Sequence, residues 1–148
     1  MRYLPILTLL LVGAAILVGQ AESESCCEMR LSSEAKTPSV FTAKVTNLNQ
    51  PLVTVHETSA EADLTVHAPS ETGHEAERTP YGKRLLTRER GGRMILRELR
   101  AGESVSQELD VRRLFQLTSG TYRVTVVRDV ILGATRIPVH AAITIRLP

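Results

Sequence analysis

The residues of this chain with the widest scope for chemistry are its histidines, and two of them lie close together in the sequence. His67 and His74 flank a short segment rich in turn-forming residues, with Glu71 and Glu75 beside them. Two imidazoles and a carboxylate are a donor set that zinc and similar metals accept. This spacing enforces no ligand geometry, so we predict exposed polar positions on a hairpin and expect neither a metal nor any other cofactor.

The chain lacks the local motifs of the common enzyme classes. It contains no Gly-x-Ser-x-Gly elbow, no phosphate-binding P-loop, no Gly-x-Gly-x-x-Gly turn and no His-Glu-x-x-His pair. Each of these motifs places a nucleophile, a phosphate or a metal at a fixed point of the backbone. Without them, we expect a protein that is not an enzyme.

Cys26 and Cys27 are the only cysteines, and they are adjacent. Adjacency rules out the disulfide between sheets that antibody domains use. A disulfide between neighbours requires distortion, because consecutive Cα atoms lie about 3.8 Å apart and a disulfide normally spans at least about 4.4 Å. Four hypotheses stay open: disulfides between chains, a redox-labile vicinal pair, lipidation of Cys26, and unreactive thiols in a flexible tail over residues 22–28.

The N-terminus has the three parts of a secretory signal peptide. Arg2 precedes an apolar run from Leu4 to Val18, and small residues at Gly19 and Ala21 suit a signal peptidase. We predict a signal-peptide helix over residues 1–21, cleavage after Ala21, and a secreted or periplasmic product. The alternative is a retained membrane anchor, for which the apolar run is short. A membrane partner is therefore expected only if this segment is retained or Cys26 is lipidated.

Charge is distributed unevenly along the chain. Residues 22–77 hold ten acidic and three basic side chains, whereas residues 83–100 hold seven basic and two acidic ones. The candidate binding residues are the aromatic and basic side chains at the start of this basic segment: Tyr81, Lys83, Arg84, Arg88, Arg90 and Arg93. The alternative interpretation is a solvated surface whose arginines pair with the acidic half of the chain.

The composition also indicates what kind of partner such a surface would have. Stacking on nucleic-acid bases requires exposed aromatic side chains, and only Tyr81 is a plausible one. An arginine-rich loop carried by a rigid framework fits protein recognition better. We therefore predict an unidentified protein or envelope component as the partner and no specific nucleic acid.

Most of the chain after the signal alternates apolar and polar residues with the period of a β-strand. We expect strands around Met29 to Leu31 and over residues 39–47, 52–56, 62–68, 93–99 and 104–109, with long strands after Gly120 and over residues 137–147. Residues 52–56 and 62–68 are expected to pair, residues 74–79 read as a charged edge strand, and residues 83–92 read as a loop held by Leu85 and Leu86. No true helix is expected after the signal.

Four residues are predicted to shape the second half of the domain. Gly102 forms a turn, and Asp110 caps a single helical turn. Gly120 opens the following strand, and Tyr122 lies where sandwich domains place a tyrosine corner, whose hydroxyl bonds back to the backbone. These roles are structural.

The turns and corners together carry a resemblance. Val45-Thr46-Asn47, Asp63-Leu64-Thr65-Val66, Leu99 to Ser104 and Gly120 to Val124 resemble small immunoglobulin-like domains of the bacterial intracellular-proteinase-inhibitor type, and also the sandwich prodomains of secreted metallopeptidases. The resemblance implies an all-β, immunoglobulin-like antiparallel sandwich of seven to nine strands over residues 29–148. It also implies a second function, that of a peptidase inhibitor or chaperone-like prodomain. The chain departs from the inhibitor family at Ala101, in having no tryptophan, and in its signal segment.

Overall fold

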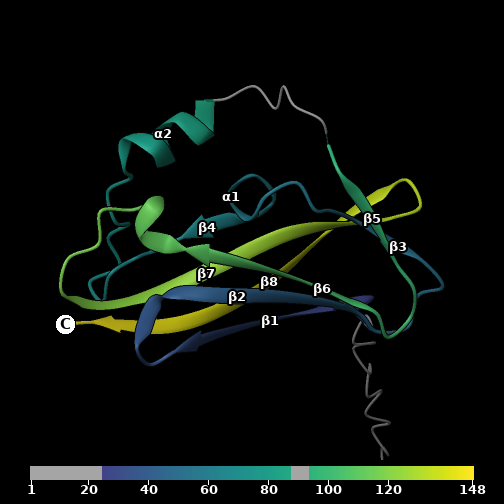
Figure 1. The fold of residues 1–148 in the computed structure, drawn as a ribbon, viewed down its shortest axis with the longest axis horizontal. Coiled ribbons are helices and arrows are strands. Elements are labelled where there is room, and N and C mark those ends of the chain that lie inside the picture. The colour runs from purple at the N-terminus through teal and green to yellow at the C-terminus, as the bar shows by residue number, and fades with distance from the viewer. Residues whose placement is uncertain (1–24, 88–93) are drawn as a thin grey trace, which may run out of the picture.

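The protein is an all-β sandwich of two antiparallel sheets (Figure 1). The structure is a computed structural model, and it describes residues 25–87 and 94–148. One sheet has the order β1–β2–β6 and contains β1 (Cys27–Glu34), β2 (Thr37–Asn47) and β6 (Ser104–Asp110). The other contains β3 (Val53–His56), β4 (Thr65–His67), β5 (Leu96–Leu99), β7 (Gly120–Leu132) and β8 (Thr135–Leu147). The predicted all-β antiparallel sandwich of seven to nine strands is confirmed. The predicted signal peptide lies outside the described residues.

Strand β7 organises the five-stranded sheet. Along one edge it pairs with β8 over its whole length, from Gly120 opposite Leu147 to Leu132 opposite Thr135. Its other edge is shared, because β4 pairs with it around Val126 and β3 pairs with it around Val130. Strand β5 then adds to the far side of β3. The sheet therefore depends on one strand near the end of the chain.

The core lies between the two sheets and consists mainly of aliphatic side chains. The alternation in sequence correctly predicts the inward face of the long strands β2, β7 and β8. Inward residues are buried or, as at Ala141 and Ile143 of β8, half-buried against the core, and the residues between them are more exposed. The largest wholly buried apolar side chains are Phe41, Phe115, Leu99, Leu109, Ile145, Val45, Val53, Val55, Val111, Val124 and Val126. With few aromatic residues available, the two sheets are held together by valine, leucine and isoleucine.

One expected strand pairing and one expected edge strand are wrong. Strands β3 and β4 do not pair with each other, since both bond to β7, and the short helix α1 (Ala60–Asp63) occupies the start of the segment expected as a strand. Ser59 caps this helix, because its hydroxyl accepts a hydrogen bond from the Ala62 N–H at 3.2 Å. Residues 74–79 form no strand. Isolated bridges at Glu75 and Arg78, together with scattered hydrogen bonds such as that from the Gln116 N–H to the Glu77 carbonyl at 2.7 Å, tie them to the sandwich.

The expectation of a flexible tail is wrong for its last residues. Strand β1 begins at Cys27, and the side chains of Cys26 and Cys27 belong to the core with 7% and 2% of their surface exposed. The Cys26 carbonyl accepts a hydrogen bond from the Leu48 N–H at 3.0 Å. The Ser25 hydroxyl donates to the Cys27 carbonyl at 2.6 Å. Both thiols are free and enclosed by the protein.

The predicted turn, cap and corner residues are confirmed. Gly102 has a φ of +83° and its N–H donates to the Asn47 carbonyl at 2.7 Å. Asp110 caps the 3₁₀ turn η1 (Val111–Arg113) by accepting from the Arg112 N–H at 3.0 Å. Gly120 begins β7 with a φ of +141°, which favours glycine. The Tyr122 hydroxyl accepts from the Thr118 N–H at 3.2 Å, as a tyrosine corner requires.

A second helix stands where the sequence suggests a loop. Helix α2 (Pro80–Thr87) lies at one end of the sandwich beside η1 (Figure 1). The expectation of a loop from residue 83, and of no helix after the signal, is therefore wrong. In the described residues no helix combines the length and the apolar character needed to span a membrane.

Candidate functional site

The N-terminus of α2 is fixed by Thr79 and Pro80. The Thr79 hydroxyl accepts a hydrogen bond from the Gly82 N–H at 2.9 Å, which is the bond of an N-cap residue. Pro80 occupies the first helical position, where proline has a suitable φ and its missing N–H costs nothing. The same Thr79 hydroxyl donates to the Arg113 carbonyl at 2.6 Å, and the Thr79 N–H donates to the Leu114 carbonyl at 2.9 Å. One residue thus starts the helix and attaches it to η1.

Gly82 lets α2 approach the backbone after η1 closely. It is buried, and a Cβ atom at this position would overlap the carbonyl group of Leu114. Leu85, one turn further along, is half-buried against the core cluster, whereas Leu86 has 67% of its surface exposed. The predicted anchoring role is therefore right for Leu85 and wrong for Leu86.

We use the name α2–η1 surface for the exposed or half-exposed side chains of the two elements that carry positive charge or an aromatic ring: Tyr81, Lys83, Arg84, Arg112 and Arg113. Arg113 lies over the Tyr81 ring at 5.3 Å from its centre and forms an ion pair with Glu61 at 2.5 Å. Lys83 pairs with Glu77 at 2.9 Å. Among the ion pairs of the described residues, none includes Arg84 or Arg112.

The structure joins only part of the predicted binding set. Tyr81, Lys83 and Arg84 lie together on α2, while Arg88, Arg90 and Arg93 lie outside the described residues. Arg112 and Arg113 complete the surface, although sequence reasoning did not select them. The signal for them was present: Arg112 and Arg113 follow Val111 in the helical turn that Asp110 is predicted to cap, and charged residues of such a turn normally face solvent.

The polar side chains around His67 do not converge on a metal site. The His67 Nδ1 lies 3.8 Å from Glu75 Oε1, but that same oxygen accepts a hydrogen bond from the Ala68 N–H at 2.9 Å. Glu75 is thereby used to bridge the two sides of the turn. In residues 25–87 and 94–148, no three histidine, cysteine or acidic side chains gather in a way that could hold a metal ion.

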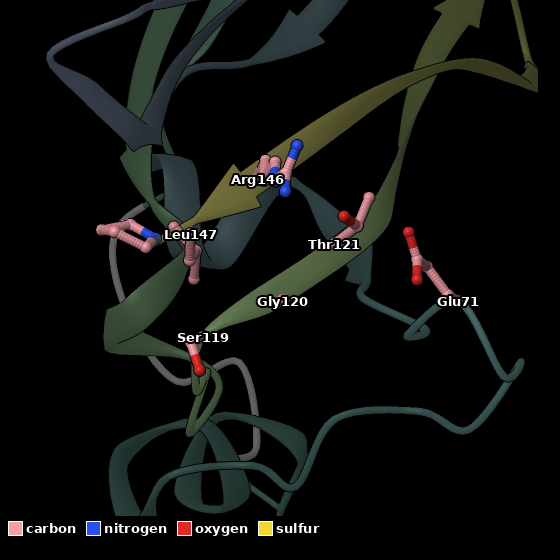
Figure 2. A pocket seen from close by; sticks show the side chains of 7 residues that line it. Glu71, Ser119, Gly120, Thr121, Arg146 and Leu147 are labelled. Atoms are coloured by element: carbon pink, nitrogen blue, oxygen red, sulfur yellow. The ribbon is translucent and has the colours of Figure 1, made fainter.

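A shallow pocket of about 550 Å³ opens where β7 begins and β8 ends (Figure 2). It is lined by Glu71, Ser119, Gly120, Thr121, Arg146, Leu147 and Pro148. In Figure 2 the Arg146 and Thr121 side chains extend from neighbouring strands, and the Glu71 carboxylate lies beyond Thr121. The lining is mainly polar and the pocket is open to solvent, whereas small-molecule sites are usually enclosed and largely apolar. This pocket therefore ranks below the α2–η1 surface as a candidate site.

An arginine is buried inside the sandwich. Arg128 points inward from β7 with 1% of its surface exposed, and its Nη2 donates to the carbonyl oxygen of His56. Its Nε and Nη1 are enclosed and have no hydrogen-bond partner in the described part of the chain. Burial lowers the pKa of the Arg128 guanidinium, and the nearby carboxylates of Asp63 and Glu57 oppose this effect.

The two carboxylates near Arg128 have other partners. Asp63 Oδ2 accepts hydrogen bonds from the Thr58 N–H at 2.7 Å, the Ser59 N–H at 3.1 Å and the Gln107 side-chain amide at 2.9 Å. Glu57 pairs with Arg97 at 3.1 Å. Together, the contacts of Arg128, Asp63 and Glu57 tie the segment around α1 to both sheets, so we assign these three residues a structural role.

The surroundings of Cys27 favour the protonated form of its thiol. Burial, followed by the hydrogen bond and the charge interaction with Cys26, raises the pKa of the Cys27 thiol from 9.0 to about 12. A thiol reacts with electrophiles and disulfides as its thiolate. The arrangement therefore disfavours Cys27 as a nucleophile while β1 is in place.

No protein-family model matches the chain, and no curated protein is significantly similar to it.

Proposed function

We propose that this protein is an exported, non-enzymatic β-sandwich that binds an acidic site on another protein or envelope component through the α2–η1 surface. The observation that carries the proposal is the attachment of α2. Its cap, Thr79, bonds to the backbone of Arg113 and Leu114, so the two basic elements form one unit. Binding residues concentrate on such segments when a rigid framework fixes them.

The charges of this surface support an anionic partner. Glu61 and Glu77 neutralise Arg113 and Lys83, while Arg84 and Arg112 are exposed with no ion pair among the described residues. Arginine at a protein interface binds carboxylates through paired hydrogen bonds, and the Tyr81 ring adds apolar contact area. Arg88, Arg90 and Arg93, which the sequence also predicts as binding residues, belong to the same basic segment of the sequence.

Charge reversal tests this function. The double variant Arg84→Glu/Arg112→Glu is compared with Arg123→Glu/Arg136→Glu, which makes the same change of charge at exposed positions of β7 and β8. Each protein is cross-linked in envelope extract of the native cells and its captured partners are identified. We expect the first variant to lose a partner that the second keeps. Equal capture by both variants would contradict the proposal.

The same preparations test the other parts of the proposal. N-terminal sequencing of protein taken from the cell exterior or envelope should begin at Glu22 if the signal peptide is cleaved as predicted. Protein found only inside the cell with Met1 intact would contradict export. A secreted peptidase among the captured partners, inhibited at a one-to-one ratio, would assign the chain to the inhibitor or prodomain alternative.

A further inference from the structure

Among residues 25–87 and 94–148, strand β5 lies at an edge of its sheet and pairs with β3 alone. The Glu57 N–H donates to the Ile95 carbonyl at 2.8 Å, which turns the backbone groups of Ile95 toward the β3 side. Since these groups alternate in direction along a strand, Met94, Leu96 and Glu98 turn theirs away from the sheet. A further strand could bond to these three residues.

The side chains at this edge are unusually apolar for their exposure. Met94, Ile95 and Leu96 are consecutive and have 56%, 50% and 55% of their surface exposed. Natural edge strands are commonly protected by charged side chains, above all lysine, by proline or by a bulge. The charged residues here, Arg97 and Glu98, leave residues 94–96 wholly apolar; residues 94–99 contain no lysine or proline, and β5 pairs with β3 in unbroken register. Such an edge is suited to pairing with another strand.

We propose that a second copy of this chain pairs with β5, antiparallel and with Leu96 on the two-fold axis. Two identical strands that pair antiparallel are related by a two-fold axis perpendicular to the sheet. Opposite side chains then lie on the same face of the sheet only if one residue, at the axis, faces its own copy. A centre at Arg97 or Glu98 would place like charges directly opposite each other, which is destabilising. A centre at Ile95 would leave the outward backbone groups of Glu98 with no partner in β5 of the second copy. A centre at Leu96 avoids both problems.

This register gives each described edge residue a compatible neighbour. Leu96 faces Leu96 of the second copy, Met94 faces Glu98, and Ile95 faces Arg97. Arg97 already forms an ion pair with Glu57 at 3.1 Å, so its aliphatic part is what covers Ile95. The outward backbone groups of Met94, Leu96 and Glu98 all find partners. The two five-stranded sheets would then join into one continuous sheet across the dimer.

The oligomeric state of the full protein tests this inference. Sedimentation equilibrium should detect a dimer, and Leu96→Lys should raise its dissociation constant by about tenfold or more, because two charges then meet on the axis. Leu86→Lys, at the exposed leucine of α2, is the matched control and should leave the dimer unchanged. A single-chain mass at about 1 mM, where even weak specific association is populated, would overturn the proposal. So would a dimer that Leu96→Lys does not weaken.

A cross-link tests the register and does not depend on how well Leu96→Lys folds. Directly opposite residues of this type have Cα atoms about 5.5 Å apart, which a disulfide spans. Oxidised glutathione should therefore join two Leu96→Cys chains, the two thiols losing their hydrogens as glutathione is reduced. Leu86→Cys should stay unlinked, and the native thiols are buried. Failure of Leu96→Cys to link, or equal linking of both variants, would overturn the register. If the chain is a monomer, and another protein captured by the wild type is not captured by Leu96→Lys, the edge would be assigned to that protein.

Discussion

The backbone carbonyl of Leu114 occupies the space into which a side chain at Gly82 would project. This contact determines how closely α2 can pack beside η1. The cap bonds of Thr79 and the half-buried Leu85 hold the helix in the same position. The arrangement of the α2–η1 surface therefore depends on a residue that carries no charge and no functional group.

Gly82→Ala should loosen α2. The added methyl group must displace either the helix or the Leu114 backbone, and we expect a loss of about 1–3 kcal/mol in the free energy of unfolding. Urea denaturation measures the loss, and faster trypsin cleavage after Lys83 and Arg84 would report local detachment. Lys83→Ala is the control, because its ion pair with Glu77 is exposed and should change stability by less than about 1 kcal/mol. Unchanged stability of Gly82→Ala would contradict the close packing.

Tyr122→Phe should destabilise the sandwich by about 1–2 kcal/mol. The variant keeps the buried ring but removes the hydroxyl that bonds to the Thr118 backbone and side chain at 3.2 Å, leaving a partly buried N–H without a partner. Tyr81→Phe removes a hydroxyl that has no hydrogen bond within the described residues and should be nearly neutral. Both are compared by urea denaturation. A similar effect of the two variants would argue against a tyrosine corner.

The raised pKa of Cys27 makes stability depend on pH in the alkaline range. The unfolded chain ionises this thiol near pH 9, whereas the folded protein keeps it protonated up to about pH 12. The contribution is fully present below pH 9 and is lost progressively as the pH rises toward 12, because only the unfolded state gains from releasing the proton. Subtracting the profile of Cys27→Ala, measured by denaturation between pH 8 and about 11, removes the other titrating groups. A constant difference between the two profiles would contradict this prediction.

Because Arg128 is buried with two unpartnered nitrogens in the described part of the chain, we expect Arg128→Met to be more stable than Arg128→Ala and no less stable than the wild type. Arg128→Met fills most of the same volume and removes two buried nitrogens that lack partners, while Asp63 and Glu57 keep their other bonds. We expect it to be as stable as the wild type or more stable by about 1–2 kcal/mol. Arg128→Ala leaves a void and should lose about 2–4 kcal/mol. If Arg128→Met lost as much free energy of unfolding as Arg128→Ala, the guanidinium itself would be required for stability.

The sandwich could be predicted from sequence because its long strands follow a strict two-residue period. The same period contained two signals that the prediction did not use. Cys27 continues the alternation of Met29 and Leu31, which places it on the buried face of β1. Arg128 continues the inward positions of Val124 and Val126, so its burial follows from register although its residue type argues against it.

The errors concern short elements, where periodicity carries little information. Helix α2 has two turns, and its start is marked in the sequence only by Thr79-Pro80, a pair that can equally end a strand. Helix α1 has a single turn and its cap, Ser59, looks like any loop residue. The proximity of α2 and η1 was not predictable, because it depends on a tertiary contact between Gly82 and Leu114, which are far apart in sequence.

The position of β7 in the chain has a consequence for assembly during synthesis. A ribosome delivers β3, β4 and β5 well before it completes β7, yet β3 and β4 bond to β7 and β5 bonds to β3. The β1–β2 hairpin can close early, but the five-stranded sheet cannot form until the last part of the chain has emerged. Until then the Val53–His56 segment and the apolar edge at Leu96 have no completed sheet to join. A nascent chain stalled before Gly120 would therefore remain half a sandwich, with the inner face of β2 exposed to solvent.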